Sequence, residues 1–143
     1  MIHRAFATTI LLATLITAPG CGGAAGGEGP EPVEVQGLRN LGLMYKMVSD
    51  ALARPPKTID ELRKAEAQFP GGFSDIGENN VAIYLGASLS DGDPSDILAY
   101  DRVAPLQGGY VLTRDGGVKK LTAAEFKAAK KAGSKPWTAP SGS

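Results

Sequence analysis

The chain has 143 residues, of which 43% are hydrophobic and 21% are charged, and this composition is typical of one small globular domain. Its 15 Lys and Arg residues equal its 15 Asp and Glu residues, so the charge balance gives no general attraction to nucleic acid. The single histidine is His3, and the chain beyond it therefore lacks histidine general bases and histidine metal ligands. No GxGxxG, P-loop or GxSxG pattern is present, so the sequence gives no indication of a nucleotide-binding site or of the nucleophile turn of a hydrolase.

The first 20 residues have the pattern of an export signal. Arg4 supplies a positive start, and an apolar run over 5–16, interrupted only by threonines, follows it. The run is shorter than the ~20 apolar residues that a membrane-spanning helix needs. We therefore predict a signal peptide over 1–20 rather than a permanent span.

Cys21 follows the small residues Ala18, Pro19 and Gly20, an arrangement that resembles the lipobox of bacterial lipoproteins. In that class of protein the signal is removed before the cysteine, which then carries lipid. The resemblance predicts lipidation of Cys21 and attachment to a membrane on the exported side, in the cell envelope. Leucine is usual where Ala18 stands and Pro19 is unusual, so an ordinary secretory signal that leaves a free thiol is the alternative.

A linker is predicted over 21–35, which is rich in Gly, Ala, Pro and Glu. The folded domain is predicted over 36–133. Its first helix is expected over 36–53, where apolar residues recur at steps of three and four: Leu38, Leu41, Tyr45, Val48 and Leu52. Pro55 and Pro56 end this helix, because proline removes a backbone donor.

The next elements are a short helix and two strands. Thr58 and Glu61 form a capping-box pattern at the start of the helix, and the turn at Pro70 closes it. The apolar, partly β-branched runs over 81–85 and 97–100 predict strands.

The clearest β pattern is a hairpin with strands over 110–113 and 118–121, joined through Asp115-Gly116-Gly117 by a loop of two or three residues. A final helix is expected from the capping box of Thr122 and Glu125 to Ala132, with Gly133 as a left-handed stop. Residues 134–143 are predicted to be a disordered tail, in which Trp137 either docks back or is exposed. The fold class is therefore α+β, with a small antiparallel sheet.

This order of elements resembles the soluble part of the pseudopilin-like proteins of bacterial secretion systems, in the group whose signature is a histidine followed after nine residues by Asp-Gly. The resemblance extends over 38–126, and the matching residues are Asp115, Gly116, Val111, Leu112 and Val118. It implies the architecture and a secretion-related assembly. Pro105 stands at the place of the signature histidine and Gly117 at that of a second one, so no role of those histidines transfers. An export signal also replaces the long N-terminal helix of the group.

Two groups of charged residues are candidates for binding. Asp91, Asp93 and Asp96 crowd one loop, which suggests either a calcium site or a solvated turn; the turn is preferred, because the glycine and glutamate of an EF-hand loop are replaced by Asp96 and Arg102. A group of lysines is interpreted as a solvated face, with anionic lipid or polysaccharide as the alternative: Lys119, Lys120, Lys127, Lys130, Lys131 and Lys135.

The sequence therefore predicts a non-enzymatic, lipid-anchored interaction module that binds another envelope protein, in a secretion-related assembly as one form of that role. No catalytic residue, metal, cofactor or nucleic-acid partner is predicted. The alternative is a lipoprotein that binds a small ligand or glycan in a concave site. Tyr84, Tyr100 and Tyr110, together with Trp137, are the aromatic residues that such a site would use.

Overall fold

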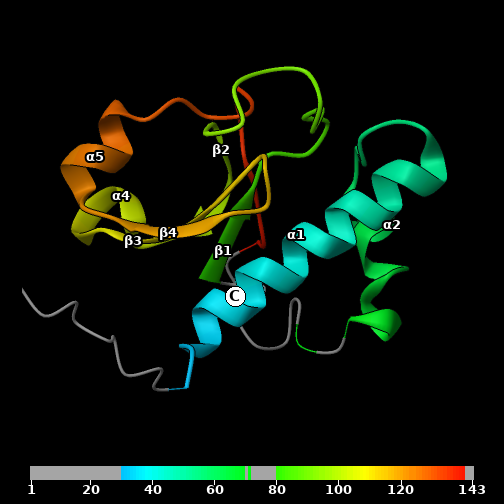
Figure 1. Ribbon diagram of the computed structural model, residues 1–143, viewed down its shortest axis with the longest axis horizontal. Coiled ribbons are helices and arrows are strands. Elements are labelled where there is room, and N and C mark those ends of the chain that lie inside the picture. The colour runs from blue at the N-terminus through cyan, green and yellow to red at the C-terminus, as the bar shows by residue number, and fades with distance from the viewer. Residues whose placement is uncertain (1–29, 70, 72–79, 141–143) are drawn as a thin grey trace, which may run out of the picture.

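The computed structural model describes residues 30–69, 71 and 80–140 (Figure 1). The elements follow one another in the order α1 (Val33–Leu52), α2 (Ile59–Arg63), the short 3-10 helix η1 (Glu66–Gln68), β1 (Val81–Ile83), β2 (Ile97–Asp101), α4 (Ala104–Gln107), β3 (Gly109–Thr113), β4 (Val118–Leu121), α5 (Ala123–Ala128) and β5 (Trp137–Thr138). The predicted α+β class is confirmed. The predicted signal over 1–20 and Cys21 lie outside the described residues.

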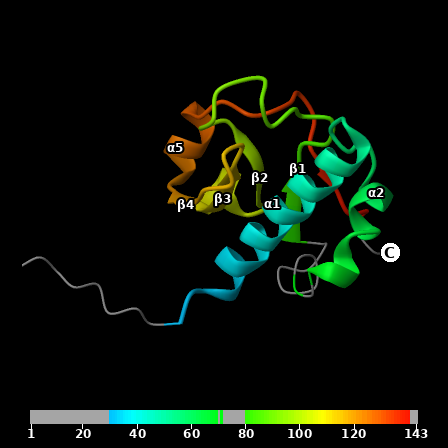
Figure 2. The same cartoon turned by 45° about the vertical axis from the view of Figure 1, so that its right-hand side comes forward.

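One five-stranded sheet organises the domain, with neighbouring strands antiparallel in the order β4-β3-β2-β1-β5. Figure 2 shows the strands following one another from β4, at the outer side, to β1, with α1 passing obliquely beside them. Helices lie on both faces of the sheet. On one face a Cβ built on Gly42 of α1 would lie 3.0 Å from the Leu112 Cδ1 atom of β3. On the other, the Phe126 ring of α5 lies 4.8 Å from the Tyr100 ring of β2.

The helix α1 forms because its apolar residues make one stripe, and that stripe is the centre of the core. Its buried members include Leu38, Leu41, Met44, Tyr45 and Val48. Leu52, expected to continue the stripe, is instead 40% exposed. The helix ends at this residue, because Ala53 takes a left-handed conformation with φ 51° and breaks the helical path of the backbone.

Tyr45 joins α1 to the loop after β1. Its hydroxyl donates a hydrogen bond to the carbonyl oxygen of Ala87 over 2.7 Å. Burial raises the pKa of Tyr45 to about 12, so the hydroxyl remains a donor at neutral pH. The bond therefore holds the loop against the helix and satisfies a buried polar group.

Both predicted helix caps are present. The Thr58 hydroxyl accepts a hydrogen bond from the Glu61 N–H over 3.4 Å at the start of α2. At the start of α5, Thr122 and Glu125 form the full reciprocal capping box, with the Thr122 N–H donating to the Glu125 carboxylate over 2.7 Å. Each side chain satisfies an amide that the first helical turn would leave without a partner.

Glu61 also closes the turn between α1 and α2, and this makes a pH dependence testable. Its carboxylate accepts hydrogen bonds from the Arg54 guanidinium and the Lys57 N–H, each over 2.8 Å, and the hydrogen bond from Arg54 is the main reason that the pKa of Glu61 falls to about 2 from 4.5. Since the folded-state pKa lies below the unfolded-state value, ionised Glu61 stabilises the fold above about pH 4.5, and this contribution is lost as the pH falls toward about 2.

We therefore expect Glu61→Gln to lower the thermal midpoint slightly at neutral pH and to reduce the fall in the midpoint between about pH 4.5 and pH 2. The measurement is thermal unfolding followed by circular dichroism across this range. Arg54→Gln serves as the matched variant and is expected to produce a similar flattening. A Glu61→Gln profile that runs parallel to the wild-type profile contradicts the assignment.

The hairpin between β3 and β4 is confirmed, and its loop has three residues, over 114–116. The Thr113 N–H donates to the Gly117 carbonyl oxygen over 2.8 Å, and the Gly116 N–H donates to the Thr113 carbonyl oxygen over 3.0 Å. Gly116 has φ 84°, which is the left-handed position that such a three-residue loop requires.

The predicted boundaries are wrong at both ends of the domain. At the N-terminal end, α1 begins at Val33 inside the predicted linker, and Val35 is buried. At the other end, Trp137 and Thr138 form β5 beside β1, so the predicted disordered tail is ordered over 134–140. Val35 lies three residues before Leu38 and so continues the apolar stripe of α1, whereas Trp137 and Thr138 are ordered by pairing with the distant strand β1.

The final helix is shorter than predicted. It ends at Ala128 rather than Ala132, because the backbone beyond it bonds to β2 instead of continuing the helix. The Ile97 N–H donates to the Lys130 carbonyl oxygen over 3.0 Å, and the Ala132 N–H donates to the Ile97 carbonyl oxygen over 2.8 Å. Gly133 does not adopt the predicted left-handed conformation. The short helix α4, over 104–107, was not predicted.

Candidate functional site

The three tyrosines proposed for ligand binding do not line one surface. Tyr84 and Tyr100 are buried, with their ring centroids 6.1 Å apart. Tyr110 is half-buried on the opposite face of the sheet, because its neighbour Val111 pairs with Tyr100 and adjacent residues of a strand point to opposite faces. The expectation of a shared aromatic site is therefore wrong: two of these rings pack in the core with Phe126. Trp137 also packs against the core.

The acidic loop is organised by its own hydrogen bonds. The Asp93 carboxylate accepts from the N–H and the hydroxyl of Ser95 over 2.9 and 2.7 Å, and these bonds lower the pKa of Asp93. Asp96 points instead to Arg114. Within the part of the chain that the structure describes, no three His, Cys, Asp or Glu side chains gather closely enough to hold a metal ion.

A buried cationic side chain, Arg114, connects three segments and was not foreseen from the sequence. Its Nε atom lies 3.4 Å from the Asp96 Oδ2 atom, with both side chains largely buried. The guanidinium also donates to the carbonyl oxygens of Ser88, of Asp91 over 2.7 Å and of Ala132 over 3.0 Å. Because these acceptors are backbone oxygens of loops, the geometry indicates a structural clamp.

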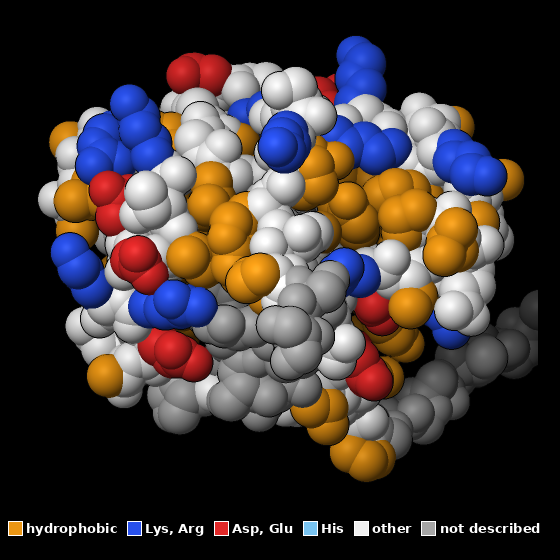
Figure 3. Space-filling view, turned by 180° about the vertical axis from the view of Figure 1, so that it is seen from behind, with side chains coloured by type: hydrophobic (Ala, Val, Ile, Leu, Met, Phe, Trp, Pro, Cys, Tyr) orange, Lys and Arg blue, Asp and Glu red, His pale blue; other side chains and the backbone are white. Residues whose placement is uncertain are grey.

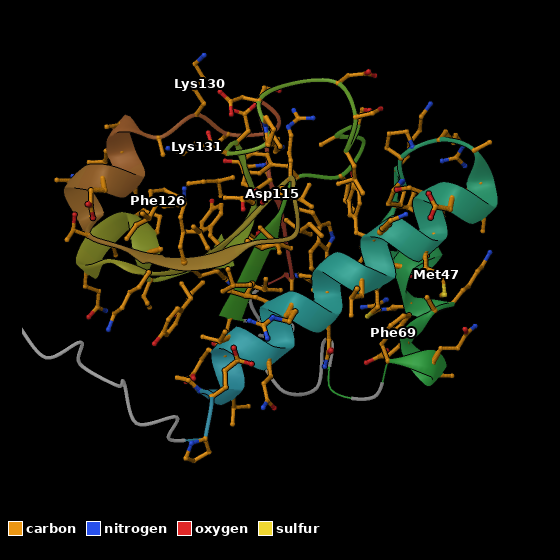
Figure 4. The ribbon with its side chains drawn as sticks, viewed as in Figure 1. Met47, Phe69, Asp115, Phe126, Lys130 and Lys131 are labelled. Carbon is orange, nitrogen blue, oxygen red and sulfur yellow. The ribbon has the colours of Figure 1, made fainter. Side chains whose placement is uncertain are left out.

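Three hollows in the described part of the chain border α1. The largest of the three, of about 750 Å³, lies between the end of α1 and the loop over 88–91, and it has a mixed polar lining that includes Ser49 and the ion pair between Lys46 and Asp50. The second, of about 330 Å³, lies between α1 and the hairpin turn, with Gly42 and Arg114 in its lining. The smallest, of about 260 Å³, lies between α1 and the α2–η1 segment; Met47 is in its lining. Figure 4 shows Met47 and Phe69 extending into the space between these two segments.

The outer strand of the hairpin, β4, forms an open edge of the sheet. The Thr113 N–H donates to the Gly117 carbonyl oxygen, and along an antiparallel ladder hydrogen-bonded pairs alternate with pairs that are not hydrogen-bonded. The backbone of Lys119 therefore bonds to β3, whereas the N–H and carbonyl groups of Val118 and Lys120 point outward. Among the described residues no backbone hydrogen bond reaches these outward groups. The edge therefore offers two N–H donors and two carbonyl acceptors.

Side chains along this edge are cationic. Lys119 and Lys120 are both exposed, and the Lys120 ammonium lies 5.5 Å from the centroid of the Tyr110 ring. After Gly117 the chain carries six lysines and one glutamate, Glu125, whose carboxylate is engaged in the α5 cap. The C-terminal part of the domain is therefore strongly basic, although the whole chain is neutral.

The lysines beyond α5 have different environments. Figure 4 shows Lys130 pointing away from the domain and Lys131 turning toward Phe126. The Lys131 ammonium donates to the carbonyl oxygens of Phe126 and of Ala129, lies 4.4 Å from the Phe126 ring, and has a pKa lowered by burial. Lys131 is thus a structural cap at the end of α5 rather than part of a free cationic surface.

Cationic side chains also gather along the upper rim of the face shown in Figure 3, above a group of apolar ones.

Comparisons with protein-family models, with curated proteins and with solved structures found no match for this chain. Of the helices in the described residues, none combines the length and the apolar character that crossing a bilayer requires. One geometric feature suited to recognition is the cationic β4 edge, which we define as the outward backbone of Val118 and Lys120 with the side chains of Lys119 and Lys120.

Proposed function

We propose that this protein is a non-enzymatic interaction module, held by lipid on Cys21 to the exported side of a membrane, that binds another protein of the cell envelope. The observation that carries the proposal is the cationic β4 edge, because open strand edges are surfaces that proteins use to bind one another through main-chain hydrogen bonds. The resemblance of the hairpin to pseudopilin-like proteins supports a secretion-related assembly as the setting.

The distance between anchor and domain suits this role. The first helix begins at Val33, the twelfth residue after Cys21. A fully extended segment of this length would span at most ~40 Å, at ~3.4 Å per residue. The anchor would thus confine the domain to a layer near the membrane, where the concentration of an envelope partner is effectively raised.

Site-specific photo-cross-linking in native membranes tests the proposal. A photoreactive amino acid is placed in the full chain either at Lys120, on the cationic β4 edge, or at Lys64, an exposed residue after α2. We expect a cross-link to one envelope protein from the Lys120 position. We also expect Cys21→Ser, which removes the anchor, to weaken that cross-link severalfold, because the local concentration falls.

The outcomes separate the parts of the proposal. A cross-link from Lys64 but not from Lys120 would support an interaction module but would show that the β4 edge is not its binding surface. A cross-link that is equally strong with Cys21→Ser would remove the anchor from the mechanism. The absence of any cross-linked protein from both positions would contradict the proposed function.

A further inference from the structure

We infer that the cationic β4 edge binds an extended acidic segment of the partner protein as an additional strand of the sheet. This inference rests on the proposed function and specifies the chemistry of the partner. An added strand would meet the outward N–H and carbonyl groups of Val118 and Lys120, which have no backbone partner among the described residues. These groups account for affinity in strand addition, whereas flanking side chains account for selectivity.

The two lysines determine which segment is favoured. Because adjacent residues of a strand point to opposite faces, Lys119 and Lys120 place one ammonium on each side of the edge. A residue of the added strand directly opposite Lys120 would have its Cβ atom about 5 Å from that of Lys120. At this separation opposite charges stabilise a cross-strand pair and like charges destabilise it.

The cation at Lys120 is not neutralised within the described part of the domain. No ion pair joins it to a carboxylate there, and its neighbour across the hairpin is Tyr110. Lys119 is close enough to Asp93 and Asp115 for weak electrostatic effects on their pKa values, but it forms no ion pair with either of them. An incoming carboxylate would therefore find an ammonium at Lys120 that rests over the Tyr110 ring and that no carboxylate of the described residues engages.

The same charges argue against a second copy of this chain as the occupant. Antiparallel pairing of β4 with β4 of another molecule would bring the Lys119 and Lys120 side chains of both copies together across the new ladder. Lysines on an edge strand oppose such self-association. The same lysine charges that would repel a second copy would attract the carboxylates of an acidic strand.

Hydrogen exchange measured by NMR on the full processed chain in detergent micelles tests the inference. The probe is a short peptide that alternates glutamate and valine, and its control alternates lysine and valine. We expect the acidic peptide to slow amide exchange at Val118 and Lys120 by at least about tenfold, because bound amides stop exchanging with water. The Lys119 amide, already bonded to β3, serves as an internal reference that should change little.

Two variants make the test specific. Lys120→Pro removes an outward N–H while leaving the bonds between β3 and β4 in place, and we expect it to abolish the protection at Val118. The double variant Lys119→Glu, Lys120→Glu keeps the backbone edge and is expected to reverse the preference toward the lysine peptide. Lys127→Ala, on α5, is the matched control that should retain the wild-type response.

Protection by both peptides to the same degree would overturn the acidic preference, and no protection by either would overturn the edge as a binding site. Both results are distinct from a failure of the proposed function, which is measured by cross-linking to the membrane partner from either of two surfaces. Retained protection in Lys120→Pro would also overturn the inference, provided that the exchange of the β3 amides shows an intact hairpin.

Discussion

Replacing Arg114 with methionine is expected to destabilise the domain by about 3–5 kcal/mol, because it leaves the Asp96 carboxylate buried without its counter-charge. Both side chains of the pair are largely buried, at 8% and 11% exposed. The substitution also removes the donors to the carbonyl oxygens of Ser88, Asp91 and Ala132, which hold two loops against the hairpin turn.

Urea unfolding followed by circular dichroism measures this effect. Arg114→Lys keeps the charge but has no planar fork of donors, so its loss is expected to be intermediate. The double variant Arg114→Met, Asp96→Leu removes both charges and is expected to recover much of the loss, since a buried pair is more easily replaced than broken. An Arg114→Met protein within about 1 kcal/mol of wild type would contradict the structural clamp.

Leu112→Ala is expected to cost about 2–5 kcal/mol, because it opens a cavity at the contact between β3 and α1. Leu112 is fully buried, and its side chain packs directly against the backbone of Gly42, where a helical Cβ would come within 3.0 Å. The matched control is Leu106→Ala. That leucine is 83% exposed, so its removal should change the free energy of unfolding by less than about 0.5 kcal/mol.

A second substitution at Gly42 tests the contact itself. Gly42→Ala alone should crowd the Leu112 side chain, whereas in the Leu112→Ala background the new methyl group would lie in the cavity. We therefore expect the double variant to be more stable than the sum of the two single effects predicts, which a double-mutant cycle measures. Additive effects would show that the two residues do not share this space.

Local patterns were sufficient to predict the elements that are stabilised locally. The spacing of apolar residues from Leu38 to Val48 predicted α1, and the Asp115-Gly116 turn predicted the hairpin. The capping box at Thr122 predicted where α5 begins. In each case residues a few positions apart carry the pattern: the apolar stripe of α1, the turn glycine and the capping pair, although the stripe itself packs against the distant strand β3.

The site could be predicted only in part. The lysines at 119 and 120 were recognised as a cationic group, but only the pairing of β3 with both β2 and β4 showed that β4 lies at the edge. The aromatic site failed for a similar reason, since the sequence does not show that Tyr84 and Tyr100 lie against Phe126 in the core.

The sequence by itself therefore determined the α+β class, the long first helix, the hairpin and the start of the last helix. Only the tertiary structure decided the early end of α5 at Ala128, the strand at Trp137, and the clamp at Arg114. The physical reason is that these features depend on partners far away in the chain. Ile97 forms backbone hydrogen bonds with the segment after α5, Ile83 pairs with Trp137, and Asp96 forms an ion pair with Arg114. Packing between such segments outweighs local preference, because burial and long-range hydrogen bonds contribute more than the propensity of a few residues.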